Sequence, residues 1–156
     1  LVNFIRNLLE QTGMPAKNLE LEITESLLME NTEQAVQTLR KLSLLGITLA
    51  IDDFGTGYSS LSYLKQFPLN VLKIDRTFVR DVTEDSDDAA IVNAILAMSN
   101  SLALDVVAEG VETAEQLAYL RKSQCKRAQG FYFSKAIDLN DLMDYIKQTD
   151  QDVRAV

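Results

Sequence analysis

One segment of the chain decides its fold class, Ile47-Thr48-Leu49-Ala50-Ile51-Asp52-Asp53-Phe54-Gly55-Thr56-Gly57. A continuous apolar run is typical of a strand that is covered on both faces, as in a parallel sheet. Two glycines separated by one residue are typical of a turn between a strand and a helix, and such a loop can bind phosphate through its backbone N–H groups. A plain connecting turn is the alternative. The adjacent aspartates favour a loop that is coupled to a metal ion.

Similar units precede and follow this segment. The predicted strands are 19–24, 47–52, 71–75 and 104–108, with a short β-like piece at 126–128. Helical periodicity follows at 35–42, 90–98 and 117–120, with a capping box at 113–116, and a last amphipathic helix is expected to end around Lys147. Alternating strands and helices predict an α/β fold, either an open doubly wound sheet or a (β/α)₈ barrel.

Length and composition narrow these possibilities. A barrel typically needs about 250 residues, so 156 residues would supply only its later part, and the missing initiator Met predicts a start inside a longer protein. We assign 1–149 to one domain and 150–156 to a polar tail. Hydrophobic residues make up 47% of the chain, without an apolar run long enough for a membrane segment. The net charge of −8 argues against duplex nucleic acid as a partner.

Two residue counts restrict the chemistry. The single cysteine, Cys125, excludes an intrachain disulfide and fits a reducing cytoplasm. The chain has no histidine, which excludes histidine bases and Ser-His or Cys-His pairs. A metal site must then use mainly oxygen ligands, which favour Mg²⁺, Mn²⁺ or Ca²⁺ over zinc and copper.

Charged and amide side chains gather where the predicted strands end. They are Glu22, Glu25, Asp52, Asp53, Lys73, Asp75, Glu109, Glu112 and Gln129. Ligands of parallel α/β folds bind at the carboxyl ends of the strands, so these residues would surround one mouth. Each acid taken alone could equally be a helix cap or a turn former.

Two features favour a site over a set of unrelated caps. Glu22 lies inside an apolar strand, where an unpaired carboxylate is costly unless it meets a cation. Lys73 and Asp75 are two residues apart and point to the same face of their strand, which is either a buried ion pair or a lined site. A divalent cation would relieve the repulsion among clustered carboxylates. We therefore predict a Mg²⁺ or Mn²⁺ site.

Five motifs, in order along the chain, resemble those of the EAL family. They are Leu19-Glu20-Leu21-Glu22-Ile23-Thr24-Glu25-Ser26, Ile51-Asp52-Asp53-Phe54-Gly55-Thr56-Gly57-Tyr58-Ser59-Ser60-Leu61, Leu72-Lys73-Ile74-Asp75, Val107-Ala108-Glu109-Gly110-Val111-Glu112-Thr113 and Gln129-Gly130-Phe131-Tyr132-Phe133-Ser134-Lys135. The resemblance implies a modified TIM barrel with one antiparallel strand. It also implies metal-dependent hydrolysis of cyclic di-GMP to the linear dinucleotide.

The same resemblance implies roles for the central residues. Glu22 and Asp52 would bind metal, and Asp53 would help to hold the second ion of a two-metal site. Lys73 would position the attacking water. Glu109 would bind metal or act as a base. Mg²⁺ or Mn²⁺ would be the cofactor, and Ca²⁺ is a candidate inhibitor.

Supporting roles follow in the same way. Asp75 would lie beside Lys73, and Gln129 would line the site. Glu25 would brace the Asp52–Ser60 loop, which in this family also touches a homodimer interface. Glu112 joins this group as a residue that supports the substrate or the loop.

The chain departs from the family by lacking the Glu-Ala-Leu motif and a metal-binding Asn, both of which we expect upstream of Leu1. We therefore expect an active parent protein and an almost inactive fragment. A non-catalytic cyclic di-GMP receptor or interaction module is the alternative. Two unpaired sheet edges would favour a homodimer or strand exchange. A cyclase, sensory or receiver domain could precede the chain.

Overall fold

A computed structural model of the chain describes residues 1–30, 32–57 and 64–154. Within them, five strands form one sheet in which all neighbours are parallel: β1 (Glu20–Thr24), β2 (Thr48–Phe54), β3 (Val71–Ile74), β4 (Asp105–Ala108) and β5 (Arg127–Ala128). They follow one another in chain order across the sheet. A doubly wound sheet reverses its order at a switch point. The unreversed order confirms the α/β prediction and favours the arc of a barrel.

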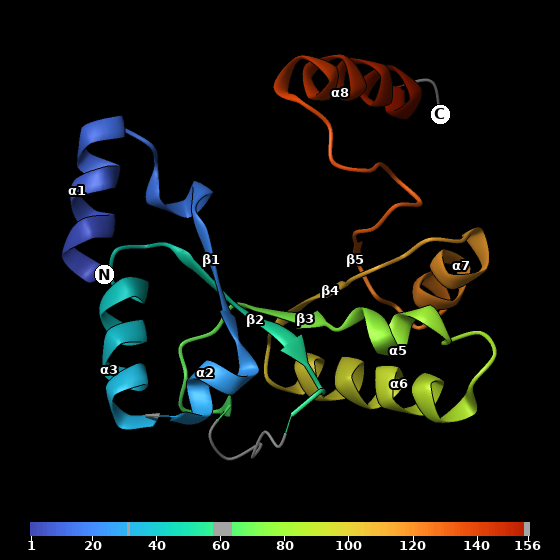
Figure 1. The fold of residues 1–156 in the computed structure, drawn as a ribbon, viewed down its shortest axis with the longest axis horizontal. Coiled ribbons are helices and arrows are strands. Elements are labelled where there is room, and N and C mark those ends of the chain that lie inside the picture. Colours follow the sequence, from blue (N-terminus) through green and yellow to red (C-terminus); the bar gives the residue numbers. More distant parts are fainter. Residues whose placement is uncertain (31, 58–63, 155–156) are drawn as a thin grey trace.

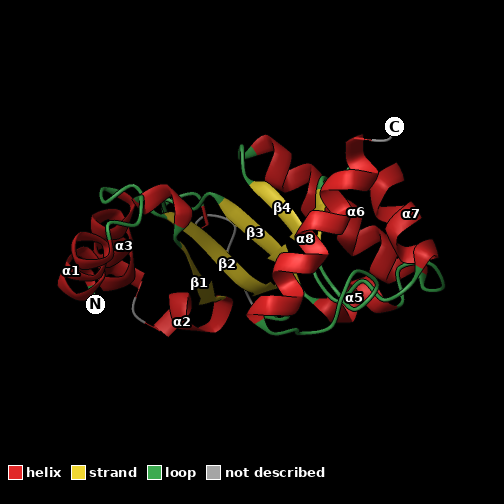
Figure 2. Ribbon diagram, turned by 90° about the horizontal axis from the view of Figure 1, so that it is seen from above, coloured by secondary structure: helices red, strands yellow, loops and turns green. Residues whose placement is uncertain are grey.

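The helices are found at both ends of the sheet. They are α1 (Val2–Thr12), α2 (Glu25–Glu30), α3 (Thr32–Ser43), α5 (Arg76–Arg80), α6 (Ser86–Ser101), α7 (Ala114–Lys122) and α8 (Leu139–Arg154), with a 3₁₀ turn at Ala16–Asn18. Figures 1 and 2 show α1 and α3 beside β1 and β2, and α5, α6 and α7 beside β3 and β4. Because all neighbouring strands are parallel, their carboxyl ends lie on a common side of the sheet.

Side-chain hydrogen bonds cap the N-termini of α5, α6 and α7. Asp75 caps α5 by accepting a hydrogen bond from the backbone N–H of Thr77. Asp85 caps α6 in the same way. Thr113 and Gln116 form the predicted capping box at the start of α7. Each cap directly follows a strand or a short turn, so the sequence places the end of one element and the start of the next within a few residues.

The hydrophobic core lies on the two central strands. Leu49 and Ile51 of β2 and Leu72 and Ile74 of β3 are completely buried, which explains their continuous apolar pattern. Helices α3 and α6 cover the sheet with buried aliphatic side chains, namely Leu39, Leu42, Val92 and Ile95. Strands β1 and β5 are the edges. The core therefore holds β2 and β3 firmly, and with them the residues at their carboxyl ends.

The predicted end of the last helix is wrong. Helix α8 continues past Lys147 to Arg154, because the polar residues that follow contain no glycine or proline to stop it. Its large apolar residues are exposed, Leu139 by 72% and Met143 by 51%, and Figure 1 shows the helix apart from the sheet. Among the described residues, no helix is long and apolar enough to span a membrane.

Candidate active site and metal-binding cluster

Lys73 is the centre of the site. It lies on the central strand β3, and its side chain is only 6% exposed. Its Nζ lies 2.7 Å from Glu22 Oε1, 3.2 Å from Asp52 Oδ1 and 2.6 Å from Glu109 Oε1. The three acids come from β1, from β2 and from the loop after β4, so one ammonium joins three different strands of the sheet.

The charge of Lys73 is fixed by these partners. Burial alone would lower the pKa of its ammonium group, because the charged form loses solvation. Hydrogen bonds to Glu109, Glu22 and Asp52 outweigh that effect and raise the pKa of Lys73 above its usual value. Lys73 therefore stays protonated throughout the neutral range. It can supply a positive charge and donate hydrogen bonds, but it cannot accept a proton.

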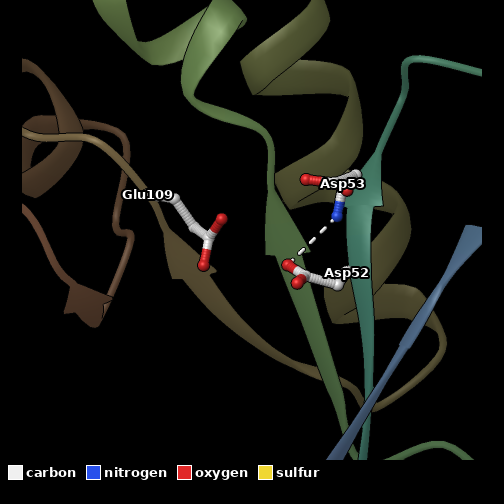
Figure 3. Close-up of side chains that lie close together, drawn as sticks. All are labelled: Asp52, Asp53 and Glu109. Atoms are coloured by element: carbon white, nitrogen blue, oxygen red, sulfur yellow. Dashed lines mark hydrogen bonds between the residues drawn. The ribbon is translucent and has the colours of Figure 1, made fainter.

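A second grouping consists of carboxylates alone. Asp52, Asp53 and Glu109 each offer an oxygen, and these oxygens lie within 4.8 Å of one another. Figure 3 shows Asp52 and Asp53 at the end of β2 and Glu109 approaching them from the other side of β3, with the Asp53 N–H donating to Asp52 Oδ1 at 3.1 Å. An all-oxygen set of this kind suits a hard divalent cation. Glu22 is connected to the group through Lys73.

The carboxylates perturb one another's ionisation. Burial, opposed by Lys73, raises the pKa of Glu109, and the charges of Asp52 and Glu22 raise it further. The pKa of Asp53 is raised as well, by burial and then by the neighbouring charges of Asp52 and Asp75. Asp53 also has a left-handed backbone, with φ 54°, which aspartate tolerates better than most residues. The site thus concentrates negative charge in a way that a bound cation would relieve.

Gln129 holds Glu109 from the far side. Its Nε2 donates to Glu109 Oε1 at 2.6 Å, the same oxygen that contacts Lys73. The next residue, Gly130, packs directly on the backbone of Val111, where a Cβ would come within 2.2 Å of the Val111 carbonyl oxygen. Val111 N–H donates to Gln129 O, and Tyr132 N–H donates to Val111 O. The loops after β4 and β5 are therefore joined backbone to backbone.

Glu25 contacts the glycine-rich loop at Gly55 and Gly57. It is 2% exposed, and its Oε2 accepts the N–H of Gly55 at 3.0 Å. A Cβ on Gly57 would come within 2.7 Å of Glu25 Oε1, so the loop rests directly on the carboxylate. Among the described residues Oε1 has no hydrogen-bond donor. Tyr58, Ser59 and Ser60, the rest of the predicted loop, lie outside the described residues.

The remaining two predicted site residues, Asp75 and Glu112, differ in how they are placed. Asp75 is buried, which would raise its pKa, but hydrogen bonds from the side chain and backbone of Thr77 lower it overall. It combines the two interpretations of its position, because it caps α5 and also faces Asp53. The side chain of Glu112 is exposed, and in the described part of the chain only its backbone N–H is held, by Gln116. Glu112 does not join the central cluster.

Two contributors were not predicted as site residues. Thr77 fixes the orientation of Asp75, and the Asp-x-Thr spacing at a helix start is the signal that could have found it. Gln116 was predicted only as part of a capping box, yet its side chain also reaches α5. Sequence spacing cannot reveal that second contact, because 36 residues separate its two ends.

Together these features define a class of site: a buried lysine among carboxylates at the mouth of parallel βα units. The EAL domain model matches residues 1–136. The chain belongs to the EAL domain family.

Individual relatives support this family assignment. Cyclic di-GMP phosphodiesterase NbdA of Pseudomonas aeruginosa is 49% identical over 147 residues, which are 94% of this chain and 19% of NbdA. A solved structure of the PaMucR phosphodiesterase in complex with c-di-GMP is 45% identical with a TM-score of 0.88, over 91% of this chain and 57% of that one. BlrP1 of Klebsiella pneumoniae, solved with manganese and cy-diGMP, is 36% identical with a TM-score of 0.81, over 86% of this chain and 34% of that one. BlrP1 has also been solved with calcium and cy-diGMP.

The matches are partial on the relatives' side. This chain spans about a fifth of the length of the curated relatives, 19% of NbdA and 21% of MucR. The family assignment therefore applies to the domain that these residues form.

Proposed function

We propose that the protein carrying this chain hydrolyses one phosphodiester bond of cyclic di-GMP and releases the linear dinucleotide. The observation that carries the proposal is the contact of Lys73 with three carboxylates at the ends of neighbouring strands. The names of the relatives NbdA and MucR support it, because both are called cyclic di-GMP phosphodiesterases.

Lys73 and Glu109 have different proposed roles in this hydrolysis. The permanently charged Lys73 attracts the anionic phosphodiester and stabilises the negative charge that develops on its oxygens. Glu109 is the best candidate to accept a proton from the attacking water, because it lies beside Lys73 at the mouth of the site and burial raises the pKa of its carboxyl group. Its Oε1 already accepts hydrogen bonds from Lys73 and Gln129, which leaves Oε2 for this role.

Glu22, Asp52 and Asp53 would hold a divalent cation, with Glu109 near enough to Asp52 and Asp53 to be a further ligand if it is not the base, and we propose Mg²⁺ or Mn²⁺ in a two-metal site. When bound, such ions bind phosphate oxygens and activate water for attack. Ca²⁺ fits the same oxygen ligands and is proposed as an inhibitor. Glu25, Asp75, Gln129 and Glu112 are proposed to support the loops around these groups.

The test uses the full-length protein that carries this chain. With Mg²⁺ or Mn²⁺ it should convert cyclic di-GMP to the linear dinucleotide, as followed by chromatography, and chelation should stop the reaction. Glu109→Gln should lower kcat by at least about 100-fold, as expected for loss of a general base. Lys147→Met removes an exposed lysine of α8, a helix that Figure 1 shows apart from the sheet, and should leave kcat unchanged. Tight binding of the nucleotide without turnover would replace the enzyme with the receptor alternative.

The proposal also covers the isolated fragment and the surroundings of the domain in the parent protein. The 156 residues alone are proposed to be nearly inactive, since they contain no Glu-Ala-Leu motif. A homodimer, a cytoplasmic location and an upstream cyclase, sensory or receiver domain are proposed for the parent protein. The open edges β1 and β5 support association with another chain.

A further inference from the structure

Gln116 is a buried polar side chain outside the cluster of charged residues. It occupies the first turn of α7 and is only 5% exposed. Its Oε1 accepts the backbone N–H groups of Glu112 at 2.7 Å and Thr113 at 3.0 Å. Its Nε2 donates to the backbone carbonyl of Arg80 at 2.9 Å. A buried amide that uses both its ends in this way holds its neighbours in one arrangement.

The two ends of Gln116 belong to different parts of the site. Arg80 is the last residue of α5, the helix that begins directly after Asp75. Glu112 and Thr113 end the loop that begins with Glu109. The side chain therefore connects the element after β3, which carries Lys73, to the loop after β4.

The rest of this loop is held by contacts with β3, with the start of α5 and with the segment around Gly130. Glu109 N–H donates to Ile74 O at 3.1 Å, and Val111 N–H donates to Gln129 O at 3.0 Å. Gly110 packs on Arg76, where a Cβ would come within 2.5 Å of the Arg76 side chain. Within the described residues, the Gln116 side chain is the one that ties the far end of the loop to α5. Its loss would detach that end from α5 and leave Glu109 to its contacts with Ile74, Lys73 and Gln129.

We propose that Gln116 is a positioning residue, which sets the placement of Glu109 relative to Lys73 by anchoring the Glu109–Thr113 loop to the end of α5. The expected effect on kcat rests on the proposed function. The expected effect on the Glu109–Thr113 loop does not depend on that function. Gln116 touches none of the groups assigned to substrate or metal, so it acts through the loop.

Three variants of the full-length protein separate this role from general stability. Gln116→Met keeps the size of the side chain and removes both kinds of hydrogen bond. Gln116→Glu keeps the acceptor for the loop and removes the donor to Arg80. Tyr119→Phe is the matched control in the same helix, because it removes the hydrogen bond from Asn93 to Tyr119 at 2.9 Å and leaves the loop untouched.

The first measurement is amide hydrogen exchange in peptides covering 109–113, which requires no activity. Gln116→Met should speed exchange there at least about tenfold, while Gln116→Glu and Tyr119→Phe retain protection. Unchanged exchange in Gln116→Met would overturn the proposal even if the wild-type protein turned over no cyclic di-GMP.

The second measurement is steady-state kinetics. Both Gln116 variants should lower kcat by about 10- to 100-fold with little change in KM, as for other residues that orient a ligating or reacting group. Tyr119→Phe should match the wild type. A wild-type kcat in Gln116→Glu would show that the bond to Arg80 is not needed and would refute the anchoring role. A wild-type protein without turnover would contradict the proposed function and leave the exchange result to decide on Gln116.

Discussion

Lys73 controls the electrostatics of the site because it is the one cation that contacts Glu22, Asp52 and Glu109 among the described residues. Three carboxylates around one ammonium leave a net negative cluster. The protein tolerates it because the acids are still partly exposed, with 47%, 22% and 16% of their side chains accessible. Such an arrangement stores repulsion that either water or a bound cation must offset.

Replacing Lys73 by methionine tests how much the ammonium group offsets the repulsion among the three carboxylates. In metal-free buffer, Lys73→Met should lower the free energy of unfolding by about 2 kcal/mol, less than for a fully buried pair because the acids are partly solvated. Mn²⁺ should restore part of the loss, since binding to the folded state stabilises it. Urea denaturation with and without Mn²⁺ measures both effects. Lys147→Met breaks an exposed pair and should change stability by less than about 0.5 kcal/mol, and equal losses would contradict the prediction.

Cys125 offers a test of pH dependence away from the acid cluster. Burial raises the pKa of its thiol, although hydrogen bonds with the backbone of Arg127 and Ala108 oppose this. Below the pKa of the unfolded chain, about 8.5, both states hold the neutral thiol. As pH rises further, the unfolded thiol ionises first, and the folded state loses stability.

We expect the pH dependence of stability to differ between the wild-type protein and the Cys125→Ser variant. The stability of the wild-type protein relative to Cys125→Ser should fall between pH 8 and pH 10, as followed by denaturant unfolding at each pH. The reference variant removes this titration and leaves those of lysine and tyrosine in place. A constant difference across the range would contradict a raised thiol pKa. Alkylation of the folded protein at pH 8 should also be slower than that of free cysteine.

At the scale of elements, strand ends and the loops after them are held by different means. The loop after β4 is held by backbone contacts with β3 and with the segment around Gly130, and by the Gln116 side chain at its far end. The described part of the loop after β2 packs on the buried Glu25 carboxylate through Gly55 and Gly57, and Gly55 also packs on Phe78. Since Gly55 and Gly57 both contact the same carboxylate, these two contacts with Glu25 should be coupled.

A double-mutant cycle tests the coupling. Gly57→Ala should cost about 1–3 kcal/mol of stability, because its Cβ would overlap Glu25 Oε1. Glu25→Ala removes both that oxygen and the acceptor of Gly55 N–H, so Gly57→Ala should cost much less in its presence. Thermal unfolding of the two single variants and the double variant gives the interaction energy. Strictly additive losses would show that the loop does not rest on Glu25.

For the whole molecule, the sequence predicts the strands because β2 and β3 are covered on both faces and leave a continuous apolar pattern. It predicts the position of the site because parallel strands bring their carboxyl ends to one side. It does not predict which acids meet: Glu112 follows the same strand as Glu109, yet its side chain is exposed to solvent. Nor does it predict the end of α8, because apolar periodicity reports what a helix packs against, and the helix outlasts its apolar stripe.

The same geometry leaves β1 with an unpaired edge. An apolar groove borders that edge, lined by Leu21, Ile23, Leu27 and Leu39 among others. Exposed strand edges beside apolar surface favour pairing with another chain, and a lysine on such an edge opposes it. We therefore expect the 156-residue chain to self-associate, and Ile23→Lys to reduce this association.

Sedimentation velocity over a range of concentrations measures the effect. The wild-type chain should shift toward larger species as concentration rises, and Ile23→Lys should shift less. Leu44→Lys is the matched control, because Leu44 is 86% exposed in the turn before β2 and lies away from the edge. Equal reduction by both substitutions would assign the effect to added charge and not to the β1 edge. A concentration-independent monomer for the wild-type chain would rule out association through either edge, because the unpaired backbone groups of β1 and β5 are present in every copy.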